Sequence, residues 1–187
     1  MKFLAFLLAP FFIFSNPQVL DVDIIDYESF VNHTPEAIQK LKDALRNKGI
    51  VGIRGAPGYR EKAGTYIDAL RAFSALPLEV KEKYSPQQLA DEAKHFLGYE
   101  VGSEKFQRPD GSWVVDDMKH SIYTIFPDMS ENRWPEEVDL KTPFLEVCKV
   151  VSEVGKTILE DLGIISEKTG IYRDEIRHVC RQLHYQK

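Results

Sequence analysis

Histidine and cysteine are the side chains through which this sequence could hold a metal ion or carry out nucleophilic chemistry. His33 and Glu36 stand at a spacing compatible with metal ligation. Pro35 between them is typical of the first turn of a helix, so we interpret them as a surface pair. Cys148 and Cys180 form no C-x-x-C motif, and each lies in an apolar pattern that predicts packing in the core. The sequence therefore predicts neither a catalytic residue nor a metal site.

The composition is that of one globular domain or part of a larger one. Of the 187 residues, 43% are hydrophobic and 28% are charged, which allows a core of useful size. The net charge is -5, and no run of basic residues alternates with aromatic ones. A nucleic-acid-binding surface needs a basic patch, so we expect no nucleic-acid partner.

Residues 1–19 differ in kind from the rest. Lys2 precedes an apolar run from Phe3 to Phe14, and polar residues follow, an order typical of a secretory signal peptide. The run is too short to cross a bilayer as a helix, so we predict no transmembrane segment. Pro17 stands where a signal peptidase would act, which leaves an apolar segment packed on the domain, or a wrongly chosen start codon, as alternatives. Cleavage would imply export, for example to the periplasm; otherwise the protein is expected in the cytoplasm.

The first half of the chain predicts a strand–helix–strand unit. A short strand covers 22–26, and Thr34 is a good N-cap for a helix that ends at Gly49. Ile38, Leu41 and Leu45 recur at helical spacing. A short β-branched strand over 50–53 follows at once.

The middle of the chain predicts a second helix, several short strands and a long third helix. The second helix carries an apolar stripe over 63–73, and a shorter helical turn covers 78–84. Turn residues then separate short strands, one of them over 118–126. Thr142 is the expected N-cap of the longest helix, whose apolar face includes Val151 and Gly155. A glycine inside a helix costs about 1 kcal/mol relative to alanine, so we expect close packing at Gly155.

The last part of the chain predicts a short helical connection over 164–176 and then a strand over 178–185. Val179, Arg181, Leu183 and Tyr185 should point to one side of this strand. A buried strand needs hydrogen-bond partners for its backbone N–H and C=O groups, and the preceding chain offers only short strands. This pattern suggests a domain that is cut in the middle.

The order of these elements and motifs, from residue 20 to 187, resembles one enzyme family. That family is the isopenicillin N synthase-like, Fe(II)- and 2-oxoglutarate-dependent oxygenases. The matching segments, in chain order, are Val22–Asp26, Lys48–Ile53, Phe73–Tyr84, Gly98–Glu100, Asp117–His120, Asn132–Pro135 and Leu183–Tyr185. Each is short, so the resemblance depends on their order and spacing.

The resemblance implies an α/β (α+β) fold. It would contain the N-terminal helical layer and the first strands of a double-stranded β-helix (jelly roll), truncated before the catalytic barrel core. Arg54 replaces a histidine of the family pattern, His120 a glutamate and Gln186 a proline. The resemblance therefore implies a small organic substrate without specifying which one.

The family's cofactors are Fe(II), held by two histidines and a carboxylate, and 2-oxoglutarate, which is decarboxylated to succinate. Its ligand motifs are H-x-D/E, a distant histidine and R-x-S. None of the five histidines here has an acidic residue two places on, and no arginine has a serine two places on. The family places these motifs after the strand that ends at Tyr185, so we expect the iron ligands beyond residue 187 and neither cofactor on this chain alone.

Two residues match positions close to the family's cofactor. Tyr185 corresponds to a strand tyrosine that in some relatives hydrogen-bonds the 2-oxoglutarate carboxylate, and Arg181 lies on the same face of that strand. In the alternative interpretation, Tyr185 packs in the barrel wall and Arg181 pairs with a neighbouring carboxylate.

Three functions are compatible with these observations. The resemblance implies the N-terminal part of an Fe(II)/2-oxoglutarate-dependent oxygenase, an oxidoreductase that is expected to be inactive as this chain alone. The second is a degenerate, non-catalytic oxygenase that acts as a binding or interaction module. The third is an unrelated exported α/β binding protein, which only the order of the motifs disfavours.

Overall fold

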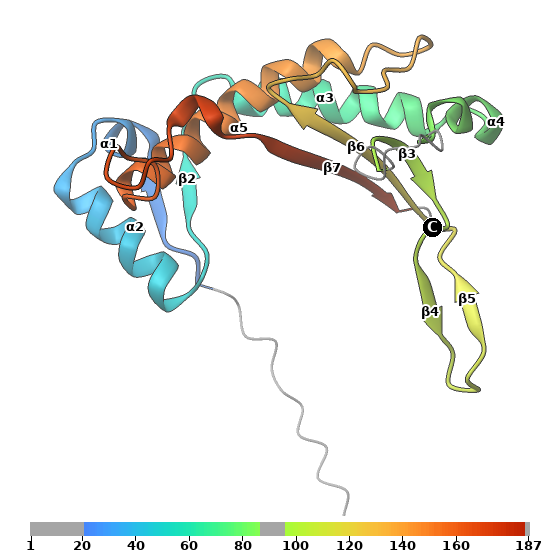
Figure 1. Ribbon diagram of the computed structural model, residues 1–187, viewed down its shortest axis with the longest axis horizontal. Coiled ribbons are helices and arrows are strands. Elements are labelled where there is room, and N and C mark those ends of the chain that lie inside the picture. Colours follow the sequence, from blue (N-terminus) through green and yellow to red (C-terminus); the bar gives the residue numbers. More distant parts are fainter. Residues whose placement is uncertain (1–20, 87–95, 186–187) are drawn as a thin grey trace, which may run out of the picture.

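The computed structural model describes residues 21–86 and 96–185 of the chain. The candidate signal peptide in residues 1–19 lies outside the described residues, as does His95. The elements, in chain order, are β1 Ile24–Asp26, α1 Tyr27–Val31, α2 Pro35–Asn47, β2 Gly52–Arg54, α3 Tyr59–Ser74, α4 Leu78–Lys81, the 3-10 helix η1 Glu82–Tyr84, β3 Gly98–Val101, β4 Lys105–Gln107, β5 Trp113–Val115, β6 Lys119–Phe126, α5 Lys141–Asp161, the 3-10 helix η3 Arg173–Glu175 and β7 His178–Tyr185 (Figure 1).

The predicted strand–helix–strand unit is confirmed. β1 and β2 pair in parallel, with Ile25 opposite Ile53, and α2 is the crossover between them. The Thr34 hydroxyl accepts a hydrogen bond from the backbone N–H of Ala37 at 3.3 Å, as an N-cap does. Leu41 is fully buried in the core of this unit.

The larger sheet has the order β3–β6–β7 and is antiparallel throughout. β6 and β7 pair along eight residues, from Lys119 opposite Tyr185 to Phe126 opposite His178. Both strands were predicted from the sequence. The expectation that the preceding chain offers β7 only short partners was wrong, because β6 matches its full length.

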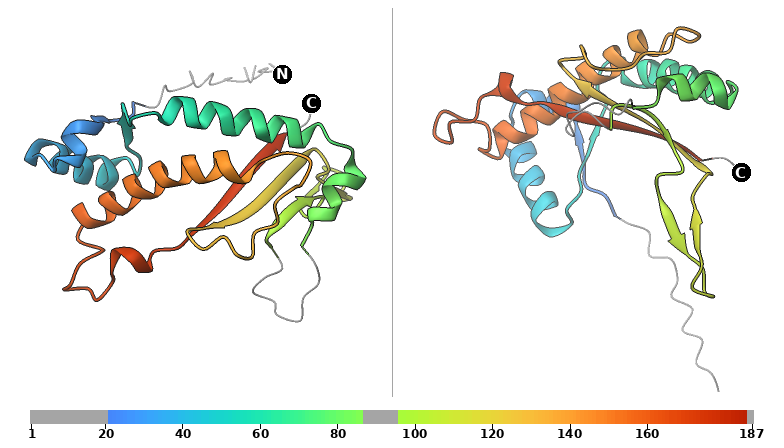
Figure 2. Two further views of the ribbon diagram at one scale, coloured as in Figure 1. Left: turned by 90° about the horizontal axis from the view of Figure 1, so that it is seen from above. Right: turned by 45° about the vertical axis from the view of Figure 1, so that its right-hand side comes forward.

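Helices α3 and α5 lie side by side over one face of this sheet (Figures 1 and 2). Phe144 of α5 packs edge-on against Tyr66 of α3, with ring centroids 5.8 Å apart. Phe144 and Cys148 form a buried cluster with Phe126 of β6. In the described part of the chain no element covers the opposite face of the sheet. No helix within the described ranges is long and apolar enough to span a membrane.

Four details of the second half differ from the sequence prediction. Helix α5 begins at Lys141 with Leu140 at the N-cap position, so Thr142 is not the cap, and the Asp139 carboxylate accepts a hydrogen bond from the Thr142 backbone N–H at 3.0 Å. A Cβ at Gly155 would meet nothing within 4 Å, so the expected close packing there is wrong. Val151 is 51% exposed, and Ser152 takes the buried position beside it. The connection over 164–176 contains a β-bridge and the short η3 rather than an α-helix.

Two of the motif segments have clear structural roles. Gly98 has a φ of 118°, and a Cβ there would lie 2.2 Å from the carbonyl oxygen of Tyr84, so only glycine fits. The side-chain amide of Asn132 pairs with the backbone N–H and C=O of Ile125, both at 2.8 Å. Asn132 therefore fixes the loop after β6 to the strand itself.

Substitution of Thr34 tests the cap of α2. Thr34→Ala removes the acceptor for the Ala37 N–H and should lower the free energy of unfolding by about 1 kcal/mol. Urea denaturation followed by circular dichroism measures this change. Thr65→Ala is the matched control, because the Thr65 hydroxyl donates only to a carbonyl of its own helix. An equal decrease in the free energy of unfolding for Thr34→Ala and Thr65→Ala would contradict the capping role of Thr34.

Candidate functional site

The β6–β7 register assigns each side chain to one face of the sheet. Ser121 and Tyr123 of β6 share the open face with Arg181 and Tyr185 of β7. Tyr185 is 63% exposed. The structure thus brings both predicted cofactor-binding residues to the same face, as the alternation in the sequence indicated.

A charged cluster occupies this open face. Lys119 and Arg181 both bind the carboxylate of Glu104, and the Arg181 Nη2 lies 3.1 Å from its Oε1. Glu104 stands at the base of the β4–β5 hairpin, where its carbonyl accepts a hydrogen bond from the Asp116 N–H. The hairpin that projects from β3 and β6 in Figure 1 therefore positions the carboxylate.

The two cations hold Glu104 in its charged form. Hydrogen bonds from Lys119 and Arg181 lower the pKa of the Glu104 carboxyl. The Lys119 side chain is only 8% exposed, so its ammonium depends on this partner. The hydrogen bond to Glu104 raises the pKa of Arg181, and the carboxylate of Glu100 on β3 adds a smaller contribution in the same direction.

Arg181 is held from several sides, whereas Tyr185 is not. The guanidinium lies over the ring of Tyr123, 4.8 Å from its centroid, and its Nη2 donates to the Ser121 hydroxyl at 3.1 Å. Arg181 thus pairs with a neighbouring carboxylate, as the alternative interpretation of the sequence expected. The described residues provide no hydrogen-bond partner for the Tyr185 hydroxyl or for the Arg181 Nη1 and Nε.

A cavity of about 160 Å³ lies on the other face of the sheet, under α3. His120 and Tyr99 line it, with the Tyr99 hydroxyl 2.5 Å from the His120 Nδ1. Burial lowers the pKa of His120 and, together with Glu82, raises that of Tyr99 to about 12. Both shifts favour the uncharged forms of the two side chains at this contact. The Oε1 of Gln182, which also lines the cavity, is buried without a hydrogen-bond partner among the described residues.

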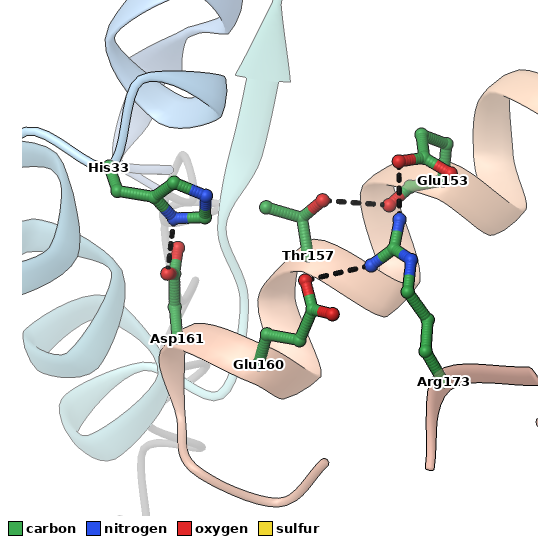
Figure 3. A network of polar contacts seen from close by, with 6 residues as sticks. All are labelled: His33, Glu153, Thr157, Glu160, Asp161 and Arg173. Atoms are coloured by element: carbon green, nitrogen blue, oxygen red, sulfur yellow. Dashed lines mark hydrogen bonds and ion pairs between the residues drawn. The ribbon is translucent and has the colours of Figure 1, made fainter. Parts of the chain in front are cut away.

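The remaining candidates lie away from both faces. His33 and Glu36 are both exposed, and the Nδ1 of His33 lies 2.7 Å from the carboxylate of Asp161 in α5 (Figure 3). In the same network, Arg173 bridges Glu153 and Glu160 of α5 and so fixes η3, which precedes β7.

Arg54 is an exposed surface residue paired with Asp26 at 2.8 Å. Within residues 21–86 and 96–185, no group of three histidine, cysteine or acidic side chains is arranged to hold a metal ion.

Residues 22–137 match the family described as non-haem dioxygenase in morphine synthesis, N-terminal. This match covers more than half of the chain. The chain belongs to this family. No curated protein matches it.

Several solved structures share this fold. A protein assigned to the 2OG-Fe(II) oxygenase family from Caulobacter crescentus aligns over 88% of this chain and 56% of its own, with 20% identity and a TM-score of 0.65. A full-length Neurospora crassa protein, in complex with alpha-KG and 5-formyluracil, aligns over 91% and 54%, with 21% identity and a TM-score of 0.59. JOX2, in complex with 2OG, Fe and JA, aligns over 82% and 42%, with 18% identity and a TM-score of 0.54.

The chain spans about half the length of these structures. The likeness confirms a mixed α/β fold of the kind found in 2OG oxygenases.

Sequence reasoning missed Glu104, Lys119 and Ser121. Alternation along 118–126 already places Lys119 and Ser121 on one face. Glu104, however, lies in a hairpin far from β7 in the sequence, and only the pairing register brings these residues to Arg181.

The charged cluster predicts a pH-dependent stability. Since the folded-state pKa of Glu104 is lowered, its contribution is present above the ordinary value of 4.5 and is lost as the pH falls through the folded pKa. Glu104→Gln should therefore destabilise the protein at pH 7, and the difference from wild type should shrink below about pH 4. Urea denaturation at several pH values measures this difference. Glu79→Gln, at an exposed position of α4, is the control and should show no such trend. A difference for Glu104→Gln that does not change with pH would contradict the charged pairing.

Proposed function

We propose that this chain is the N-terminal part of an Fe(II)- and 2-oxoglutarate-dependent oxygenase that acts on a small organic substrate. The match of residues 22–137 to the dioxygenase N-terminal family carries the proposal. The shared fold with the Neurospora crassa protein and JOX2, whose structures contain 2-oxoglutarate, supports it. We assign the domain to residues 20–187, with the β3–β6–β7 sheet as the first wall of a jelly-roll barrel.

The open face of the sheet is the proposed cofactor side. The exposed hydroxyl of Tyr185 and the unused Nη1 and Nε of Arg181 are donors suited to a carboxylate of 2-oxoglutarate. Arg181 is already oriented by Glu104, Ser121 and the ring of Tyr123. Its role is to bind and orient the anion, since a guanidinium cannot exchange a proton at neutral pH.

The iron does not fit the described residues. A facial site needs two histidines and a carboxylate within bonding distance of one ion, and the described ranges contain no such group. We therefore assign the iron ligands and the R-x-S motif to polypeptide beyond residue 187, and we derive no catalytic step for this chain alone.

The coding DNA provides a direct test. The proposal expects three motifs in the DNA that follows codon 187, translated in any reading frame. They are H-x-D or H-x-E, a later histidine, and R-x-S. Their complete absence from that stretch would contradict the proposal and support the non-catalytic alternative.

An activity measurement tests the chain itself. With Fe(II), 2-oxoglutarate and ascorbate, the purified 187-residue chain should release no succinate above a metal-free control. The physical reason is that the residues described by the structure contain no ligand set that could hold iron next to Arg181. A known 2-oxoglutarate oxygenase in the same buffer is the positive control. Succinate release above the metal-free level would show that this chain builds its own iron site.

A non-catalytic binding module is the second candidate. The lack of a metal-ligating group in the described residues favours it. An independent module should be soluble and unfold in one cooperative transition. A part that depends on further polypeptide should instead have a fluctuating core and bind hydrophobic dyes. Thermal unfolding with dye binding distinguishes the two.

A further inference from the structure

The two cysteines, 32 positions apart in the chain, meet between α5 and β7. The Sγ atoms of Cys148 and Cys180 lie 3.9 Å apart, and both thiols are free. Both residues pack in the cluster around Phe126 and Phe144, as the sequence indicated. Nothing in the sequence indicated that they would contact each other.

A second contact fixes the register of the helix against the strand. The Ser152 hydroxyl lies 3.0 Å from the Nε2 of His178. Ser152 is four residues after Cys148 on α5, a rise of about 6 Å, and His178 is two residues before Cys180 on β7, about 6.6 Å. Because these spacings match, the Cys148–Cys180 and Ser152–His178 contacts follow one another along the interface between α5 and β7. The sulfur atoms are therefore held opposite each other by the packing of α5 on the sheet.

The pair has the asymmetry that thiol–disulfide exchange uses. Cys148 is buried, at 8% exposed, whereas Cys180 is half-buried on β7, which has no second neighbouring strand in the described part of the chain. The contact between the two thiols, in which either sulfur atom can donate, lowers the pKa of Cys180 and, with burial, raises the pKa of Cys148. Cys180 is therefore the better nucleophile and the more accessible thiol.

We propose that Cys148 and Cys180 form a redox modification site, which a low-molecular-weight disulfide such as oxidised glutathione converts to an intramolecular disulfide between α5 and β7. The Cys180 thiolate attacks one sulfur of the oxidant and expels one glutathione thiolate, which leaves a mixed disulfide on Cys180. The Cys148 thiolate then attacks the Cys180 sulfur and expels the second glutathione. The two protein thiols lose two electrons and two protons, and the oxidant is reduced to two glutathione molecules.

The bond requires only a local movement. A disulfide has an S–S distance of about 2.05 Å, so the sulfur atoms must approach by roughly 2 Å from their present contact. Such a bond would fix α5 to the strand that carries Arg181, the next residue after Cys180.

The test equilibrates the full chain with mixtures of reduced and oxidised glutathione, followed by acid quenching, alkylation and mass spectrometry. Wild type should lose both thiols together, retain no glutathione, remain a single chain and yield a linked peptide that contains Cys148 and Cys180. Its Tm should rise by about 5 °C or more over the reduced form, because the bond closes a long loop in the unfolded chain.

Matched variants test the order of events. The Cys148→Ser variant should retain glutathione on Cys180, because the second thiol is missing. The Cys180→Ser variant should react with glutathione at Cys148 instead. This second reaction should be at least about tenfold slower than the first, because Cys148 is buried. Val151→Ala, at an exposed position of α5, is the control that keeps both thiols and should still form the linked peptide. The proposal is overturned if wild type keeps two free thiols at the most oxidising mixture, accumulates stable glutathione adducts, or links only between two chains. These wild-type measurements decide the question even where a variant fails to fold.

Discussion

The eight-residue antiparallel ladder between β6 and β7 is the interaction on which the rest of the structure depends. Side chains alternate between the two faces of a sheet, so this one register decides on which face each side chain of both strands lies. It places Arg181, Tyr185 and Ser121 on the open face, and Cys180 and His178 against the helices. A slip of one residue would exchange these two sets and bury the guanidinium under α5.

Helix α5 stabilises that register from the covered side and joins the two parts of the molecule. Its first half contributes Phe144 and Cys148 to the cluster on the sheet. Further along, Val154 and Ile158 pack against the core of the β1–α2–β2 unit. Near its end, Asp161 binds His33 of the loop before α2 (Figure 3). One helix thus fixes the first unit relative to the sheet, and with it the direction in which the open face points.

The open face and the covered face have different physical characters. On the open face, two cations share Glu104 beside exposed aromatic and aliphatic side chains. Such a polar but accessible surface suits the proposed contact with an anionic cofactor. On the covered face, the polar groups are less exposed: the buried Tyr99 hydroxyl contacts the His120 imidazole, and the buried Cys148 thiol contacts the half-buried Cys180. The open face is thus suited to binding, and the covered face provides the site of the proposed redox chemistry.

The elements and the family could be predicted from the order of the amino acids alone. The Thr34 cap, the apolar spacing in α2 and the alternation along β7 are local features, and the structure confirms each of them. Which of these elements meet depends on packing in three dimensions. The register of β7 on β6, the position of Glu104 beside Arg181 and the contact of Cys148 with Cys180 all join segments far apart in the chain. Periodicity within one segment carries no information about such pairings, because they follow from how the faces of different elements pack together. The same reason explains the wrong expectation at Gly155, where helical spacing predicted a packed face and the actual rotation of α5 leaves open space.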